Sequence, residues 1–473
     1  MTAHSAPSRS HIIVGDGITA LAFVDGCDLG AGDTLTLVGK SASQLGRGIA
    51  YAKGEPGTPW RYAYLLNSPA DDIDPAFATW LGARWDALSE TMAGRRPNWL
   101  GHAAPLVEQG DVYGVNAPRE IYGDYMEELA GAALGRLRAK GVRVETVDDT
   151  ARVIAPRGDG VEIRLGQGRT LFAHSADIAP GGPSTLRIAG DDGPFAAPTV
   201  FGQEHRIAEH ITAGAEIFCI GGNAAMLDVL RLCQSLIPEA ALRFVACAPD
   251  GEIPAPLIPR LPRTLTTPTL SHGHATAQSF LAEIRREIDA ALARGEEMRE
   301  IRAGFRAHFL ANPLPGYVET ETEALKVPAT LRFWLRGGTR DTILDMRRLV
   351  GEGRARMIKG AVKAIEPRDG GATVVIRDET GAETRHATGF VVNCAGAGPG
   401  STFDALTEDM LSKGFLDRCP ISRGLRVGPN CRTGLPSVRH LSPATTVIGE
   451  EPMALPLYDA HMLRTYAARA TAR

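Results

Sequence analysis

The sequence contains one pattern twice, and this internal repeat constrains the fold more than any other feature. Each copy has an apolar strand, a glycine-rich turn and a helical stretch, followed by strand-like runs separated by Gly/Asp turns. The copies end in small-residue segments at 179–183 and 395–399. One such pattern arises easily by chance, whereas two copies in the same order indicate a duplicated structural unit. We therefore predict an α/β fold built from two related units.

The first copy has the strand–turn–helix–strand order of a dinucleotide-binding fold. Its apolar strand is predicted at 11–14, its helix at 18–24 and its second strand at 34–38. Strand-like runs separated by turns then predict an antiparallel meander. These runs lie at 142–147, at 151–155 with 161–165, and at 170–178.

The second copy follows the same order. A strand is predicted at 216–220, a helix with apolar residues at helical spacing at 224–236, and a further strand at 242–247. A charged, helical stretch at 275–306 opens an insertion that extends to about 348, and a second meander is predicted at 354–393. We thus expect two Rossmann-like, three-layer units with antiparallel meanders and a helical insertion.

The first glycine turn fits a G-x-G-x-x-A pattern through Gly15, Gly17 and Ala20. Gly15 permits the tight turn, Gly17 lets backbone approach a pyrophosphate, and Ala20 lets the helix pack close to the strand. The helix N-terminus then faces the negative charge of the pyrophosphate. An ordinary strand–helix turn is the alternative interpretation. Asp16 adds a negative charge between the glycines, for which the sequence offers no account.

The end of the second strand departs from this pattern. An acidic residue normally stands there and bonds a ribose hydroxyl, but the sequence has Gly39 followed by Lys40. Either another group holds the ribose or dinucleotide binding is altered. Lys40 is a candidate phosphate contact, with a solvated lysine as the alternative.

Four further segments follow in order, GRGIAY at 46–51, LLNSPA at 65–70, FATW at 77–80 and PREIYGDY at 118–125. Together they resemble the signature segments of the FAD–NAD(P)-binding family, which is similar to the flavin-containing and N-hydroxylating monooxygenases. The resemblance covers about the first 190 residues. It implies FAD at the first glycine turn, NAD(P)H at the second, and monooxygenation of a small nucleophilic substrate through a peroxyflavin.

The resemblance also implies residues that contact the cofactor. The loop with Arg47, Gly48 and Ala50 would lie beside the flavin or its ribityl chain, and Asn67 would offer amide groups to a flavin edge. Arg119 would pair with phosphate or clamp an acidic partner. Core packing is the alternative for these positions.

The segments that close the two copies are also predicted to touch a dinucleotide. The Ala179-Pro180-Gly181 segment matches the A-T-G of the family, with proline in place of threonine. Small residues are needed where backbone passes close to the cofactor. We assign Ala179, Gly181 and Gly396 to cofactor binding, with a plain Gly/Pro loop as the alternative.

The second glycine turn consists of Gly221, Gly222 and Asn223, and it resembles the family's G-x-G-x-x-x-x-D nicotinamide motif, which ends here at Asp228. Asn223 replaces the second glycine. Because asparagine tolerates positive φ better than most residues, we expect the turn to survive. The alternative is a structural relic of the fold that binds no nicotinamide.

The segment that would recognise a 2′-phosphate is altered. The family's Ser-Arg-x-Gly sequence after the next strand reads APDG here, at 248–251. The arginine that would meet the 2′-phosphate of NADPH is therefore missing. Arg260 and Arg263 are the candidates to replace it.

Composition limits the partners and the location of the chain. The formal net charge of −4 argues against a surface that coats nucleic acid or is strongly drawn to membranes. No secretory signal opens the sequence, and its apolar runs are strand-sized. Seven scattered cysteines, without a CxxC pair or zinc spacing, predict reduced thiols in a cytoplasmic protein and no metal site.

We therefore predict an FAD-binding domain at 1–190, completed by 396–473, and a NAD(P)-binding-like domain at 191–395 with a helical insertion at about 255–348. The predicted activity is that of an FAD-dependent NAD(P)H oxidoreductase, a monooxygenase of a small molecule. The alternatives are a flavin oxidase or dehydrogenase without a nicotinamide site, and a non-catalytic flavin- or nucleotide-binding protein. No acid/base pair is distinctive enough to name catalytic residues. The YDAH segment at 458–461 resembles the one that closes the flavin domain in the family.

Overall fold

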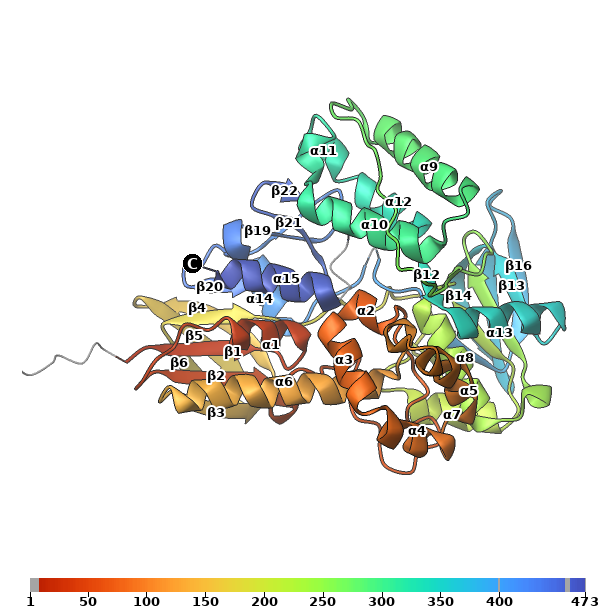
Figure 1. Cartoon of the computed structure of the whole chain (residues 1–473), viewed down its shortest axis with the longest axis horizontal. Helices are drawn as coiled ribbons and strands as arrows, with labels where there is room; N and C mark the ends of the chain where they lie inside the picture. The colour runs from red at the N-terminus through yellow and green to blue at the C-terminus, as the bar shows by residue number, and fades with distance from the viewer. Residues whose placement is uncertain (1–7, 399, 456–459, 473) are drawn as a thin grey trace, which may run out of the picture.

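The structure is a computed structural model that describes residues 8–398, 400–455 and 460–472. Two α/β units lie side by side, and a group of helices from the insertion lies above them in Figure 1. The two units have the same plan, a parallel sheet with helices on one face and an antiparallel meander on the other. This confirms the α/β fold with parallel sheets that the repeat predicts.

A parallel sheet of five strands forms the centre of the first unit. Its order is β20-β7-β1-β2-β3, so the strand at one edge comes from near the C-terminus. The strands are β1 (Ser10–Val14), β2 (Thr34–Gly39), β3 (Arg143–Asp148), β7 (Ser175–Ile178) and β20 (Val438–His440). β1 lies in the middle, and its apolar run is buried because both faces of the sheet are covered.

Helices and a meander cover this first sheet (Figure 1). The helices are α1 (Ile18–Asp25) and α6 (Arg119–Ala139), and α15 (Ala460–Thr471) packs against α1. The meander consists of β4 (Ala151–Arg157), β5 (Gly160–Leu165) and β6 (Thr170–Ala173). Apolar side chains from all of these elements meet in one buried cluster.

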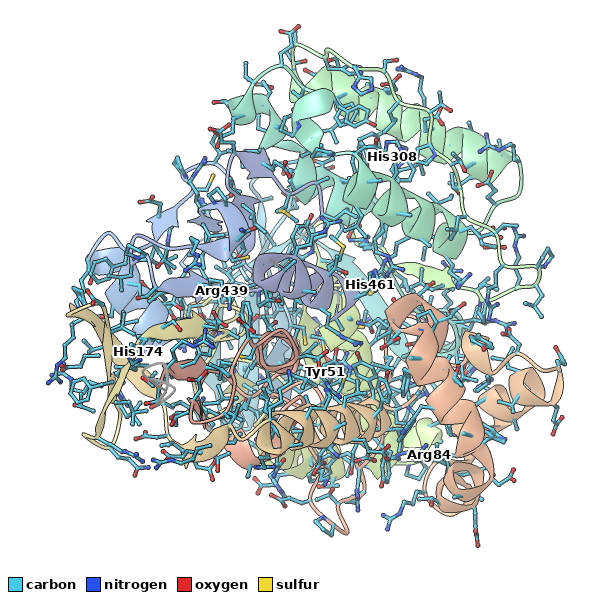
Figure 2. All side chains as sticks on the ribbon, turned by 60° about the vertical axis from the view of Figure 1, so that its left-hand side comes forward. Tyr51, Arg84, His174, His308, Arg439 and His461 are labelled. Carbon is cyan, nitrogen blue, oxygen red and sulfur yellow. The ribbon has the colours of Figure 1, made fainter. Side chains whose placement is uncertain are left out.

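The C-terminal segment is tied into the first unit by an ion pair as well as by β20. Arg439 on β20 donates from Nε to Asp177 Oδ1 at 2.6 Å and from an outer guanidinium nitrogen to the carbonyl of Ala470 in α15 at 2.8 Å (Figure 2). The rest of this segment forms α14 (Ala405–Ser412) and a sheet of order β18-β19-β21-β22. Those strands are β18 (Asp417–Arg418), β19 (Leu425–Val427), β21 (Thr445–Ile448) and β22 (Glu451–Pro452).

The second unit repeats the plan of the first. Its sheet has the order β13-β10-β9-β17-β8, with all neighbours parallel. The strands are β8 (Ala196–Ala197), β9 (Ile217–Ile220), β10 (Phe244–Ala248), β13 (Ala355–Lys359) and β17 (Phe390–Asn393). The helices are α7 (Glu204–Thr212), α8 (Ala224–Leu236) and α13 (Arg340–Gly351), and the meander is β14 (Ala361–Arg368), β15 (Gly371–Arg377) and β16 (Glu383–Thr388).

Two groups of helices join the units. The first follows β2 and comprises α2 (Ala70–Ile73), α3 (Pro75–Ala83), α4 (Trp85–Ala93) and α5 (Pro97–Glu108). The insertion comprises α9 (Ala277–Ala293), α10 (Met298–Ala311), α11 (Glu321–Ala324) and α12 (Val327–Trp334), with β11 (Ala255–Leu257) and β12 (Gly337–Thr339) at its base. Buried Arg299 of α10 donates to Asp71 and Asp72 of α2, each at 2.9 Å, which anchors the insertion to the first unit.

Three strand predictions are wrong in their pairing. The run at 142–147, assigned to the first meander, is the parallel strand β3. The run at 170–178 is two strands, because the backbone N–H of His174 turns away from the meander and donates to Ser10 O at 2.9 Å. The region at 354–393 likewise contains β13 and β17 of the parallel sheet. Periodicity detects strands, but it does not show which sheet a strand joins.

The helical stretch predicted at 275–306 is also divided. α9 ends at Ala293, and α10 starts at Met298 after a reciprocal capping box between Glu297 and Glu300. Within the described ranges, no helix has the length and apolar character to cross a membrane.

Each unit has the same kind of backbone hydrogen bond at its glycine turn. The N–H of Gly15 donates to Val38 O at 2.7 Å, and the N–H of Gly221 donates to Cys247 O at 2.7 Å. Both glycines have positive φ, +121° and +108°. A Cβ on Gly15 would lie 2.1 Å from Ala179 O. Only glycine therefore allows the first strand, its turn and the last strand of the repeat to meet.

The Gly15→Ala variant should be destabilised by more than about 2 kcal/mol, because a left-handed backbone and a backbone clash act together. Thermal and denaturant unfolding measure the loss. Gly30→Ala is the matched control, since a Cβ on Gly30 meets nothing within 4 Å. Equal stability of the two variants would contradict this account of the turn.

Candidate cofactor site

The N-terminus of α1 is bare, which means that no side chain caps it. Gly17 is its N-cap, with φ −91° and ψ −169°, and no side chain accepts a hydrogen bond from the first turn. A Cβ on Gly17 would meet only Gly48 Cα, at 3.8 Å. The unpaired N–H groups of this turn and the positive end of the helix dipole are therefore open to an anion.

A loop with a second glycine lies against this turn. The N–H groups of Gly46 and Gly48 donate to Asp16 O at 2.8 and 3.3 Å. Gly48 has φ +55°, and a Cβ there would lie 3.2 Å from Gly17 Cα. Two glycines thus face each other at the helix N-terminus, and this leaves the backbone without side-chain cover. Ala50, two residues on, is half-buried, and its contact with a cofactor stays a prediction.

Arg47 has a structural role in the glycine loop, and its contact with a cofactor stays a prediction. Its side chain is buried, with 2% of the residue exposed. The guanidinium donates to Glu127 Oε2 at 2.8 Å, to the Asp124 carboxylate and to Tyr51 O at 3.1 Å. A Cβ on Gly123 would lie 2.4 Å from the guanidinium, so α6 needs glycine at that point. Arg47 therefore fixes the glycine loop to α6.

The other residues predicted at the first site have different surroundings. Ala20 is fully buried beneath α1, which agrees with close helix–sheet packing. Lys40 is exposed at the end of β2, and Asn67 is half-buried beside Leu66. Contact of Lys40 or Asn67 with a cofactor stays a prediction.

The crossing segment, residues 179–183 at the end of β7, lies against the first glycine turn. The N–H of Ala179 donates to Val14 O at 2.7 Å. Gly181 has φ +88°, and its carbonyl accepts a hydrogen bond from Ser442 Oγ at 2.8 Å. This bond links the crossing segment to the chain that follows β20.

Asp16 fills the space beside Gly39, a relation that the sequence analysis missed. A Cβ on Gly39 would lie 2.9 Å from Asp16 Cβ and 3.0 Å from Asp16 Oδ2. The same Oδ2 accepts a hydrogen bond from the N–H of Ser41 at 2.9 Å. The sequence contained a signal of this relation. It has an acid in the turn, Asp16, and it lacks the usual acid at the end of the second strand, where Gly39 stands.

The second glycine turn differs from the first at its helix N-terminus. Asn223 has φ −128°, so the prediction that it adopts positive φ is wrong. Its Oδ1 accepts a hydrogen bond from Ala225 N at 3.0 Å, and its Nδ2 donates to Cys394 O at 2.6 Å. The side chain thus caps α8 and takes up a donor that a phosphate would use.

The glycines around Asn223 are confined. A Cβ on Gly221 would lie 2.7 Å from Cys394 O, and one on Gly222 would lie 3.0 Å from Ala248 Cβ. Gly396 has φ +77°, and a Cβ there would lie 3.9 Å from Asn223 Nδ2. These residues shape the turn, and their contact with a nicotinamide dinucleotide stays a prediction.

Arg119 clamps an acidic partner, the second of its two predicted roles. Its guanidinium lies 2.9 Å from Asp228 Oδ2 in α8, as an ion pair without the alignment of a hydrogen bond. Its Nε donates to Leu65 O at 3.0 Å. Burial raises the pKa of Asp228 to about 6, and the positive charges of Arg119 and Arg231 offset only part of this effect. The motif acid therefore joins the two units, and contact of Arg119 with a phosphate stays a prediction.

The arginines considered for a 2′-phosphate are engaged elsewhere. Arg260 donates to Glu300 at 2.9 Å, and Arg263 donates to Asp71 at 2.9 Å and to Asp111. These contacts hold the insertion in place. None of these contacts places Arg260 or Arg263 beside the second glycine turn.

The C-terminal motif is described only in part. Tyr458 and Asp459 lie outside the described residues, and His461 lies on α15 (Figure 2). His274, a histidine of the loop before α9, bonds Glu283 at 2.8 Å. In the described ranges, no group of three or more acidic, histidine or cysteine side chains is placed to hold a metal ion.

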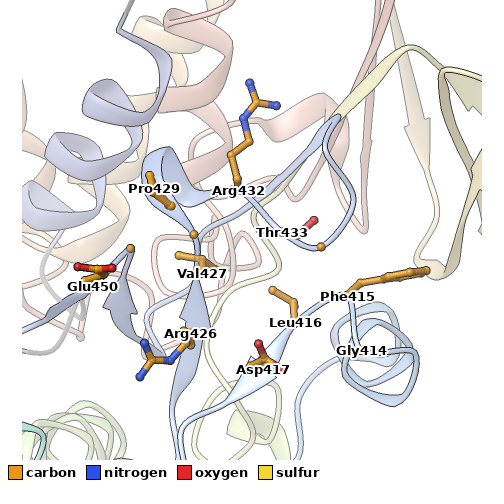
Figure 3. Close-up of a pocket in the computed structure, with 13 residues that line it drawn as sticks. Gly414, Phe415, Leu416, Asp417, Arg426, Val427, Pro429, Arg432, Thr433 and Glu450 are labelled. Carbon is orange, nitrogen blue, oxygen red and sulfur yellow. The ribbon is translucent and has the colours of Figure 1, made fainter. Parts of the chain in front are cut away.

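A surface hollow of about 390 Å³ is lined by residues other than those of the two glycine turns (Figure 3). It is lined entirely by residues between Gly414 and Glu450 and includes none of the predicted site residues. Its two arginines are engaged, since Arg426 pairs with Glu321 and Arg432 donates to Pro436 O.

Comparison with known proteins identifies the class of the N-terminal part. Residues 12–183 match the family model described as FAD-NAD(P)-binding. This segment, which holds the bare N-terminus of α1 and the loop against it, is therefore an FAD/NAD(P)-binding domain. No curated protein matches the chain in sequence.

Solved structures with the same fold include three N-hydroxylating or amine monooxygenases. The ornithine N-hydroxylase of Kutzneria sp. 744, described with reduced FAD, NADP+ and L-ornithine, has 15% identity and a TM-score of 0.52, over 98% of this chain and 97% of that chain. The lysine monooxygenase of Nocardia farcinica has 16% identity and a TM-score of 0.50, over 97% and 99%. The cadaverine monooxygenase of Erwinia amylovora, bound to FAD, has 12% identity and a TM-score of 0.52, over 92% and 88%. At these identities the similarity establishes a shared fold.

Breaking the pair between Arg119 and Asp228 should be costly. The Arg119→Met variant leaves the Asp228 carboxylate buried and unpaired, and we expect a loss of about 3–5 kcal/mol. The double variant Arg119→Met/Asp228→Leu should recover most of it. An Arg119→Met variant as stable as the wild type would contradict the assigned pair.

The same carboxylate gives a pH dependence. The pKa of Asp228 is about 6 in the folded protein and 3.8 in the reference state, so folding takes up a proton between these values. The free energy of unfolding should therefore contain a contribution that falls as pH rises from about 4 to about 6. Melting curves across this range should show that contribution in the wild type and lack it in the double variant.

Proposed function

We propose that the chain is an FAD-dependent oxidoreductase that binds FAD at the first glycine turn and takes electrons from NAD(P)H. The observation that carries the proposal is the bare N-terminus of α1, faced by Gly48. A pyrophosphate requires unpaired N–H groups, a helix dipole and backbone without side chains, and this turn offers all three.

The residues of the turn would bind and orient the cofactor. The N–H groups of the first turn of α1 would donate to the pyrophosphate, and Gly17 would let it approach. The loop that Arg47 fixes to α6 would cover the adjoining part of the dinucleotide. Bound FAD supplies electron transfer and reaction with oxygen, and the chain supplies position and exclusion of water.

Monooxygenation of a small nucleophilic substrate is the finer proposal. It is supported by the four ordered segments between 46 and 125, and by a fold shared with enzymes whose names describe ornithine, lysine and cadaverine as substrates. The ion pair between Arg119 and Asp228 joins α6 of the first unit to α8 of the second.

The Gly17→Ala variant tests the flavin site without disturbing the fold. The added Cβ meets only Gly48 Cα at an ordinary 3.8 Å, so stability should be close to that of the wild type. The methyl group lies where the pyrophosphate approaches, and the Kd for FAD should rise at least about tenfold. Titration of the apoprotein by flavin fluorescence measures it, with Gly30→Ala as control. A wild type that shows no flavin absorption bands after reconstitution would overturn the proposal.

A second candidate is a flavin oxidase or dehydrogenase that has no nicotinamide site of its own. The observation that favours it is the side chain of Asn223, which caps α8 where the dinucleotide phosphates would bind. On this candidate the substrate itself reduces the flavin, and the second unit serves as a structural support.

The Asn223→Gly variant separates the two candidates. On the main proposal, NADH or NADPH bleaches the wild-type flavin under anaerobic conditions, and the variant, whose helix N-terminus is opened, reaches half-maximal rate at about a tenfold lower concentration. Thr276→Gly, which removes the cap of α9, is the matched control and should leave the reduction rate unchanged. Stopped-flow absorbance measures the rates. A flavin that neither nucleotide bleaches, in wild type or variant, supports the second candidate and contradicts the first.

A further inference from the structure

We propose that Asp16 is the carboxylate that holds the adenosine ribose of the dinucleotide, in place of the acid that is missing at position 39. The inference rests on the proposed binding of FAD at the first turn. The sequence departs from the usual pattern at two positions, with a charge between the two glycines and a glycine at the end of the strand. A single exchange, in which the acid moves from the strand end to the turn, explains both departures.

The two positions share one space. A Cβ on Gly39 would lie 2.9 Å from Asp16 Cβ, 3.0 Å from its Oδ2 and 3.2 Å from its Cγ. A side chain at 39 would therefore begin where the Asp16 carboxylate already lies. Asp16 thus delivers its charge to the end of β2 from the turn, whereas the usual acid delivers it from the strand.

The carboxylate is held in place at this position. Its Oδ2 accepts a hydrogen bond from Ser41 N at 2.9 Å, just beyond β2. Its backbone carbonyl accepts hydrogen bonds from the N–H groups of Gly46 and Gly48, which ties the same residue to the glycine loop that lies against the first turn. Asp16 is only partly buried, so the carboxylate can still be reached by a ligand.

Its chemistry fits a ribose diol. A fixed carboxylate accepts hydrogen bonds from two neighbouring hydroxyl groups, and such charge-assisted bonds are about twice as strong as neutral ones. The same charge repels a 2′-phosphate. The first site should therefore select an adenosine with free ribose hydroxyls, as FAD has, and reject a 2′-phosphorylated one.

Other charged groups lie near Gly39. The carboxylate of Asp149 accepts hydrogen bonds from Thr150 N and Gln167 N, and Asp148 and Lys40 are the remaining rivals. Asp148 on β3 is in register with Gly39, and Lys40 follows it. Both are exposed, and neither lies among the atoms nearest to a Cβ on Gly39. The geometry therefore favours Asp16 over both.

The experiment compares ADP with 2′,3′-dideoxy-ADP as competitors of FAD on the apoprotein. In the wild type, ADP should bind about 10- to 100-fold more tightly, because only ADP can donate to the carboxylate. In Asp16→Asn the difference should shrink to about threefold or less, with FAD affinity reduced. Asp148→Asn is the matched control, since it removes a neighbouring carboxylate and should keep the full difference.

An exchange of positions completes the test. Gly39→Glu alone should weaken FAD binding, because its side chain meets Asp16, and Asp16→Gly/Gly39→Glu should restore both FAD affinity and the preference for ADP. If the wild type binds FAD but Asp16→Asn keeps the full difference, or Asp148→Asn loses it, the inference is overturned and the proposed function stands. A wild type that binds no FAD overturns the proposed function as well, and circular dichroism of each variant verifies folding.

Discussion

The contact between the backbones of Gly15 and Ala179 is the constraint on which the site depends. It brings the ends of β1 and β7 together, so that α1 starts at the edge where the loop of Gly48 also lies. No side chain fits between these backbones, and the helix N-terminus that results has no cap. An anion-binding site at this edge is therefore a consequence of how the sheet is closed.

The second unit brings the same two strand ends together, but the N-terminus of its helix α8 is capped. Gly221 meets Cys394 as Gly15 meets Ala179, but the residue that follows the turn carries an amide, which caps α8. One substitution thus separates two helix N-termini that the fold makes equivalent. The nearby pair of Asp228 and Arg119 shows a related change, because the acid of the second motif serves to join the units.

The sequence predicts the fold well where local physics decides it. The turn at Gly15, the helix at 224–236 and the duplication all follow from periodicity and glycine chemistry. The sheet to which 142–147 belongs does not follow, since pairing depends on distant strands. At the site, the open turn at Gly17 is readable, whereas the role of Arg47 is not, because its carboxylate partners lie on α6, some 80 positions away. The relation of Asp16 to Gly39 was visible only as two unexplained departures.

The central claim is that FAD binds at the bare N-terminus of α1 and not at the capped N-terminus of α8. Hydrogen–deuterium exchange of the whole chain, with and without FAD, tests it most directly. The account predicts that FAD slows exchange at the amides of 17–20 and 46–48 and leaves those of 223–226 unchanged. Unchanged exchange at 17–20 in the presence of saturating FAD would contradict it.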